Sequence, residues 1–355
     1  MPDLASLPLL VAIPVFAVAA AVVWFAGVRI TRYANVISER TGMGQALVGL
    51  LLLGGVTSLP ELAVAISSAV AGDAALAVNS VLGGVAMQVA ILALADAMIG
   101  KKALTHVLPD ATVILQGGLK ILLLSIVTAA IIVGDVPVFG VGVWMWLLAI
   151  ATGLAMWILS RVQRTQPWLA NESEYTKERE DELAARKAEQ DADRSLKWAA
   201  SRATIAGLVI VVAGYVLSRT GDAIAEQSGL GQSFIATVLL AVATSLPELS
   251  TVFSAVRAGL YTMAVSDIFG TNLFDVSFLF LVDLFSGEEA VMSASGPYEG
   301  FASIIAISVT AIFIVGLAER RDRTVLRMGY DSLAVLLLFL AGLVVLFFLR
   351  DTGAG

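Results

Sequence analysis

The sequence consists largely of long apolar runs separated by glycine, proline or charged residues. An apolar run of about 20 residues is long enough to cross a bilayer as an α-helix. Hydrophobic residues make up 58% of the 355 residues and charged residues 14%, against about 25% charged in an average soluble domain. We therefore predict an all-α polytopic membrane protein with ten transmembrane helices, over residues 9–28, 44–70, 74–98, 110–133, 137–160, 203–221, 231–256, 261–285, 300–318 and 330–349.

Lysine and arginine alternate between the two sides of this predicted bundle. The connections after the odd-numbered spans hold 19 of them, whereas those after the even-numbered spans and the two chain ends hold 2. Positive residues near span ends favour the cytoplasmic side. We therefore expect both termini outside and the polar segment 161–202 in the cytoplasm, in a plasma membrane or a bacterial or archaeal inner membrane.

Composition and motifs exclude several function classes. The formal charge of −7 comes with no basic stripe for nucleic acid, and the chain has no cysteine for disulfides or thiolate chemistry. The usual hydrolase, phosphate-loop and dinucleotide motifs are missing, and so is a nucleophile–base pair for an intramembrane enzyme. We therefore expect a protein that is not an enzyme and carries no cofactor.

A segment of the first half of the chain recurs in the second half, 187 residues later. Residues 42–72 align without gaps to residues 229–259, and TSLPEL occurs in both, at 57–62 and 244–249. Five predicted spans separate the copies, so the second copy enters the membrane from the opposite side. Inverted repeats of this kind place a substrate site near the bilayer midplane. The predicted units are residues 1–160 with a repeat over 42–98, the loop 161–202, and residues 203–355 with a repeat over 229–285.

The repeated motif combines a helix breaker with an acid. Pro60 and Pro247 each remove a backbone donor in mid-span, so we predict broken helices in spans 2 and 7. Glu61 and Glu248 follow directly, at a depth where a charge costs about 2.5–3.5 kcal/mol. Two such acids in register need a compensating partner.

Other polar residues in the spans strengthen the case for a bound cation. Span 8 adds Asp267 and Asp275, while Lys120 is the only basic residue in the interior of a predicted span, away from its ends, and we expect it to form a structural ion pair. Freed carbonyls and hydroxyls are hard oxygen ligands. The candidate cation ligands are Glu61, Glu248, Asp267, Thr57, Thr244, Ser58, Ser245, Ser80, Asn79 and Asp275.

At these residues the sequence resembles the cation/calcium antiporter superfamily, and within it the sodium/calcium exchanger branch. The resemblance implies that Glu61 and Glu248 ligate calcium together with the carbonyls of Thr57 and Thr244. It also implies that Asp267 borders the central site. Members of the family alternate access by sliding the helices that match spans 1 and 6 across a fixed core.

The chain departs from the family pattern in the first repeat. The family segment resembles GN-x-x-G-S-N, but here it begins at Asn79, with Ser80 at the expected asparagine and Val85 at the later one. The second repeat, from Asp267 to Asn272, is closer to the pattern. The central site has therefore lost one polar ligand, which affects sodium coupling more than calcium binding.

These observations favour a secondary antiporter in the lipid bilayer that exchanges calcium for sodium. One alternative is a calcium or other divalent cation exchanger driven by protons, in which the acids are protonated instead of sodium-loaded. Another is a cation channel that uses the same carboxylates as a selectivity ring, although broken helices in an inverted repeat favour a carrier.

Overall fold

The computed structural model describes residue 4 and residues 7–70, 72, 74–100, 102–108, 110, 112–165, 194–227, 244–286 and 290–349. Within these ranges, nine helices are long and apolar enough to cross a membrane. They cover Leu9–Thr41, Gln45–Val70, Ala77–Asp96, Thr112–Val133, Val143–Val162, Leu196–Gly221, Tyr261–Phe285, Pro297–Glu319 and Tyr330–Leu349. The all-α membrane fold is confirmed. The predicted span 231–256 lies partly outside the described residues, which resume at 244.

The described elements are mainly α-helices, with two short β-hairpins between them. In chain order they are α1 (Leu9–Thr41), α2 (Gln45–Val48), the π-helix η2 (Gly49–Gly54), α3 (Gly55–Val70), α4 (Ala74–Asp96), α5 (Leu104–Val107), α6 (Thr112–Val133), β1 (Pro137–Val138), β2 (Val141–Gly142), α7 (Val143–Thr165), α9 (Leu196–Gln227), α11 (Leu246–Arg257), α12 (Tyr261–Phe285), the 3-10 helix η3 (Val291–Ala294), α13 (Pro297–Glu319), β3 (Thr324–Val325), β4 (Met328–Gly329) and α14 (Tyr330–Leu349). Residues 166–193, most of the predicted loop, lie outside the described ranges.

Two short β-hairpins were not predicted from the sequence. Strands β1 and β2 pair antiparallel before α7, and β3 and β4 pair in the same way before α14. Both turn residues of the first hairpin have positive φ, 55° at Phe139 and 78° at Gly140, as a tight hairpin turn requires. The fifth membrane helix therefore begins at Val143, and the prediction of a start at residue 137 was wrong.

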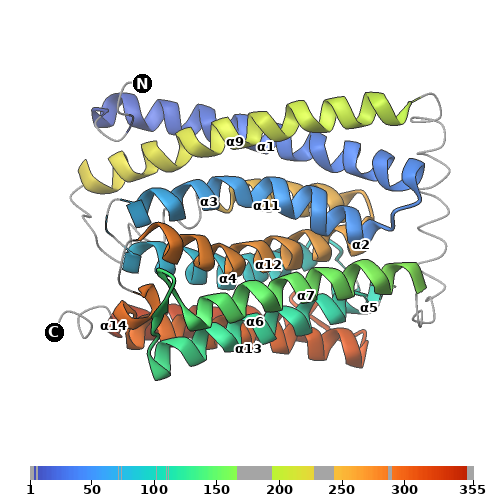
Figure 1. The fold of residues 1–355 in the computed structure, drawn as a ribbon. Helices are drawn as coiled ribbons and strands as arrows, with labels where there is room; N and C mark the ends of the chain where they lie inside the picture. Colours follow the sequence, from blue (N-terminus) through green and yellow to red (C-terminus); the bar gives the residue numbers. More distant parts are fainter. Residues whose placement is uncertain are drawn as a thin grey trace.

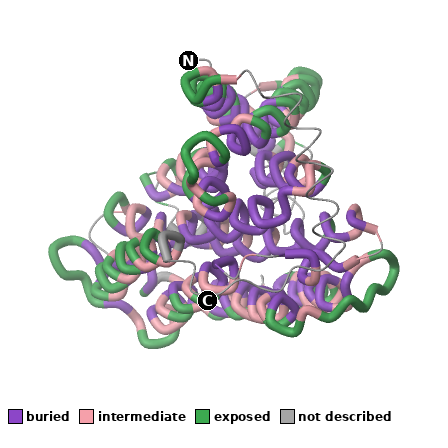
Figure 2. Tube along the Cα trace, turned by 90° about the vertical axis from the view of Figure 1, so that its right-hand side faces the viewer, coloured by how far each residue is buried: buried purple, intermediate pink, exposed green. Residues whose placement is uncertain are grey.

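The helices are arranged in layers, and their axes are roughly parallel to one another. Helices α1 and α9 pack along each other at one side of the molecule and run in opposite directions, as the colours in Figure 1 show. Below them lie α3 and α11, then α4 and α12, and the opposite side is formed by α6, α7, α13 and α14. Figure 2 shows buried residues along the middle layers and exposed residues on the outer faces. The two motif helices therefore lie between the α1–α9 pair and the rest of the bundle.

The outer pair of helices is longer than the sequence predicted. Helix α1 has 33 residues and α9 has 32, where the predicted spans were 9–28 and 203–221. Their polar ends stay helical because they pack against each other, for example through Tyr33 and Trp198, whose ring centroids lie 5.3 Å apart. Hydropathy alone does not detect such an extension.

The sequence repeat is matched by equivalent hydrogen bonds. Asp96 accepts hydrogen bonds of 2.6 Å from the backbone N–H groups of Leu104 and Gly329. Its counterpart 187 residues later, Asp283, accepts 2.6 Å bonds from the first residue of η3 and the last residue of β2, which are the equivalent positions. Each carboxylate thus ties its own half to the hairpin of the other half.

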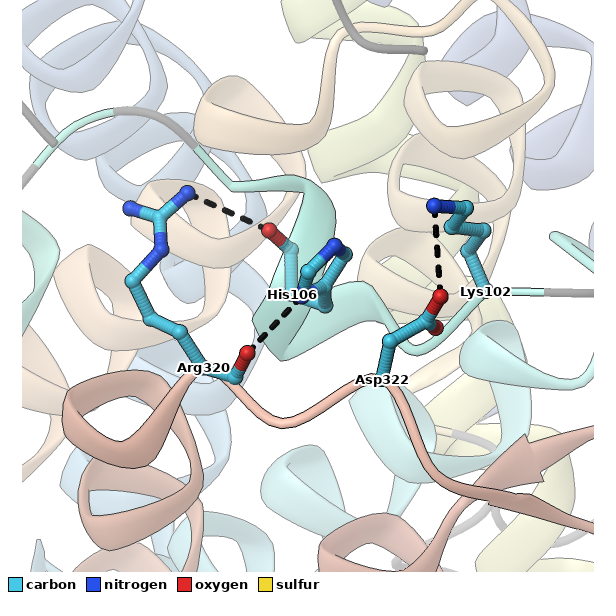
Figure 3. Close-up of polar contacts among 4 residues, drawn as sticks. All are labelled: Lys102, His106, Arg320 and Asp322. Atoms are coloured by element: carbon cyan, nitrogen blue, oxygen red, sulfur yellow. Dashed lines mark hydrogen bonds and ion pairs between the residues drawn. The ribbon is translucent and has the colours of Figure 1, made fainter. Parts of the chain in front are cut away.

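A polar cluster joins the two halves beside one of these ties (Figure 3). The Nδ1 atom of His106 lies 2.8 Å from the carbonyl oxygen of Arg320, whose guanidinium donates to the His106 carbonyl at 3.2 Å. Lys102 pairs with Asp322 at 3.2 Å. At the repeat position of His106, Ser293 donates to the carbonyl of Asp135 at 2.8 Å. The two halves are therefore joined in the same place by different chemistry.

The hairpin tips offer a matched test of the predicted orientation. Phe139 is 93% exposed and its repeat equivalent, Leu326, is 78% exposed, in a chain without cysteine. Because the positive-inside pattern assigns the tips to opposite sides, we expect Phe139→Cys to react with an impermeant thiol reagent only from outside. Leu326→Cys is expected to react only from the cytoplasm. Labelling of both tips from the same side would contradict the inverted arrangement.

Candidate cation site

The first copy of the motif lies in a helix that continues through its proline. Pro60 is inside α3, and the regular α-helical pattern is interrupted earlier, in the π-helical turn η2. The prediction of a break at Pro60 was therefore wrong in its position. Tertiary packing decides where the helix is distorted. The π-helix η2 carries glycines at both ends, and π-bulges and glycines are common sites of helix distortion.

These glycines bring η2 against the backbone of α12. A Cβ atom on Gly54 would lie 2.6 Å from the backbone nitrogen of Thr271, and one on Gly270 would lie 2.6 Å from the Cα of Leu50. Such distances leave no space for a methyl group. The contact places Thr57, in the motif, next to Thr271, with the hydroxyl oxygens 3.2 Å apart.

The second copy of the motif begins a helix. Ser245 is the N-cap of α11, Pro247 stands in the first turn, where its missing N–H costs no intrahelical bond, and Glu248 is in the same turn. An acid near a helix N-terminus is favoured by the helix dipole. A helix thus begins inside this copy of the motif, while residues 228–243 lie outside the described ranges, so the break predicted in span 7 stays a prediction.

The two motif glutamates are buried together without partners. Glu248 is fully buried and Glu61 is 7% exposed. Neither carboxylate accepts a hydrogen bond of regular geometry within the described part of the chain, although the Thr57 hydroxyl lies against Glu248. Glu61 interacts electrostatically with Glu248 and Asp275, so the three carboxylates share one region of low dielectric. Unpaired buried charges of one sign are strongly unfavourable unless a counter-charge is supplied.

The carboxylate of Asp275 completes this region from α12. Its Oδ2 atom accepts a 3.1 Å hydrogen bond from Gln88 on α4, and Ser58 also lies against it. Gln88 and Asp275 are 187 residues apart, which makes them equivalent positions of the repeat in contact with each other. Gln88 and Thr271 were not predicted as site residues from the sequence, although the repeat alignment, continued past Gly83 and Gly270, pairs Gln88 with Asp275.

The remaining predicted ligands surround this centre at different distances. Thr57, Ser58, Ser245 and Thr244 are buried beside the glutamates in the two motifs. The Oδ2 atom of Asp267 accepts from Thr251 of α11 rather than from Gln88. Asn79 and Ser80 are half-buried on α4, and no hydrogen bond joins either of them to a motif glutamate within the described residues. Asp275 and Asp267 both interact electrostatically with Glu248, so the structure brings both acids of α12 near the motif glutamates.

Carboxylates alone do not form a metal cluster here. Among the described residues, no group of three or more His, Cys, Asp or Glu side chains is close enough to hold a metal ion. A cation at Glu61 and Glu248 therefore needs hydroxyl, amide or carbonyl oxygens as further ligands. The neighbouring hydroxyls of Thr57, Ser58 and Thr271 are of the type that calcium and sodium accept.

Comparison with known proteins places the chain in a family. A family model described as sodium/calcium exchanger protein matches the chain twice, over residues 11–163 and 199–351. This chain belongs to the sodium/calcium exchanger family. The double match also shows that each half by itself carries the family pattern.

Individual relatives are distant. The inner membrane protein YrbG of Escherichia coli strain K12 is 25% identical over 250 residues, which cover 70% of this chain and 71% of that protein. The sodium/calcium exchanger MaX1 of Methanosarcina acetivorans is 28% identical over 125 residues, 35% of this chain and 34% of that protein. A solved structure of the sodium-calcium exchanger NCX_Mj superposes with a TM-score of 0.67 at 14% identity and covers 95% of this chain and 99% of that one. This last similarity establishes the fold.

The glycine contact between η2 and α12 gives a stability prediction for the site. We expect Gly270→Ala to destabilise the protein by about 1–3 kcal/mol, because the added methyl group overpacks a backbone-to-backbone contact. Gly153→Ala on the exposed face of α7 is the matched control, since a Cβ there meets no described atom within 4 Å. Thermal unfolding of the purified proteins measures both, and an unchanged transition for Gly270→Ala would show that the contact tolerates a side chain.

Proposed function

We propose that this chain is a secondary active antiporter that exchanges calcium for sodium by alternating access, with the cations bound between Glu61 and Glu248. The observation that carries this function is the pair of buried motif glutamates, whose four carboxylate oxygens have no partner in the described part of the chain. Acids at this depth are costly unless a cation neutralises them. A transported ion supplies that charge.

Exchange follows from sharing these ligands. One calcium ion or two sodium ions neutralise the two glutamates, so the two kinds of cation compete for the same oxygens. An empty site leaves both carboxylates unpaired, which disfavours the change of access without a bound ion. Family membership and the name of MaX1 support sodium and calcium as the two cations.

The contacts of the α1–α9 pair are suited to alternating access. Gly27 of α1 lies against Ser250 of α11, and its repeat equivalent, Gly214 of α9, lies against Pro60 of α3, each at a distance where a Cβ atom would clash. Two side-chain hydrogen bonds between α1 and α11, from Thr31 and Ser254, are long, at 3.3 and 3.4 Å. The small residues at both contacts and the long hydrogen bonds between α1 and α11 support sliding of this pair across the site.

Charge neutralisation of the glutamates tests the function. We expect Glu61→Gln and Glu248→Gln each to abolish calcium uptake into proteoliposomes, because an amide removes the charge that balances a divalent ion while keeping the side chain's size. Glu39→Gln, at an exposed position of α1, is the matched control and is expected to transport like the wild type.

The result is informative only for folded protein. Size-exclusion chromatography and thermal unfolding of each variant establish that the fold is intact, which we expect because an amide is less costly to bury than a carboxylate. Wild-type calcium uptake by either folded variant would remove that glutamate from the proposed site.

A further inference from the structure

Lys120 is a buried cation on α6 that the exchange of ions between Glu61 and Glu248 does not use. It is fully buried and is the one lysine or arginine found buried among the described residues. Its Nζ atom has no hydrogen-bond partner there, so the expected ion pair is not a direct contact. A buried ammonium group with neither water nor a hydrogen-bond partner is unfavourable unless nearby groups stabilise its charge.

Two residues of α12, Phe269 and Asp275, can stabilise the charge of the ammonium group. Nζ lies 5.7 Å from the ring centroid of Phe269, within the range of a cation–π interaction. Burial disfavours the charged form of Lys120, and the negative charge of Asp275, six residues after Phe269 on α12, counteracts this effect. Asp275 in turn has one oxygen, Oδ1, without a hydrogen-bond partner in the described residues. Lys120 and Asp275 are thus buried groups of opposite charge that act on each other, and the hydrogen bonds to Asp275 come from the neutral residues Gln88 and Ser58.

The repeat shows that both charges stand at positions where the other half is neutral. Asp275 corresponds to neutral Gln88, and Lys120 corresponds to Ile307, 187 residues later. The offset is unchanged on both sides of Lys120, since the bonds of Asp96 and Asp283 and the two hairpins obey it. On α12, Asp275 and Asp267 each break the symmetry of the repeat by one negative charge, since the equivalent of Asp267 is Ser80, and Lys120 breaks it by one positive charge.

We propose that Lys120 is a tethered counter-ion that neutralises Asp275 and so prevents a monovalent cation from binding at that carboxylate. This role rests on the cation exchange proposed above. It leaves the two motif glutamates as the groups that transported ions must neutralise. Without the ammonium group, Asp275 is a third acid of the site and requires a cation of its own.

The number of bound sodium ions tests this role. Radioactive sodium bound to the purified protein is counted at saturation at neutral pH, because a more alkaline medium favours loss of the proton from a buried ammonium group. We expect Lys120→Met to bind one more sodium ion per protein than the wild type, both without calcium and at saturating calcium. Lys120→Arg keeps the charge and is the matched control, with the wild-type count. An unchanged count in a folded Lys120→Met variant would overturn the proposal.

A second variant gives an independent answer, including when Lys120→Met does not fold. Asp275→Asn removes the carboxylate and leaves the lysine, so we expect its sodium count to equal that of the wild type. A loss of one sodium ion would show that Asp275 holds a transported cation, and the counter-ion role would be wrong. Wild-type protein whose sodium is not displaced by calcium would instead contradict the proposed exchange between the glutamates.

Discussion

Burial of two unpartnered glutamates between the halves of a membrane bundle is the constraint on which the rest of this structure depends. Glu61 and Glu248 occupy equivalent positions of the repeat, and their oxygens have no partner in the described residues. In a water-exposed protein such a pair is solvated, whereas buried carboxylates without a partner are costly unless a counter-charge or a proton neutralises them. The surrounding elements hold the two acids in place and limit which other charges can reach them.

Hydrogen bonds between the two halves of the repeat hold the elements around these glutamates together. Asp96 and Asp283 each hold a hairpin of the opposite half, and Gln88 bonds to Asp275, its own repeat equivalent. Close glycine contacts, as at Gly270, bring the motif helix and α12 together without side chains between them. Links of this type fix the central layers, while the outer α1–α9 pair rests on them through small residues.

Much of the fold and the central acids could be predicted from the sequence, because hydropathy, charge alternation and the TSLPEL repeat are local patterns. The features that could not be predicted depend on tertiary contacts. The π-helical turn replaces a break at Pro60 because its glycines pack on α12, and α1 stays helical beyond the apolar run because α9 covers it. Gln88 was recognisable in principle from the repeat offset. The lack of a hydrogen-bond partner for Lys120 among the described residues could not be predicted from the sequence, since it depends on how α6 packs against α12.

Calcium uptake driven by one ion gradient at a time tests the central claim most directly. Purified protein in proteoliposomes receives an outward sodium gradient without a proton gradient, and then a proton gradient without sodium. Competition of sodium and calcium for the two glutamates predicts calcium accumulation with the sodium gradient and none with the proton gradient. Accumulation driven by the proton gradient alone would contradict sodium exchange and establish protons as the coupling ion at the same acids.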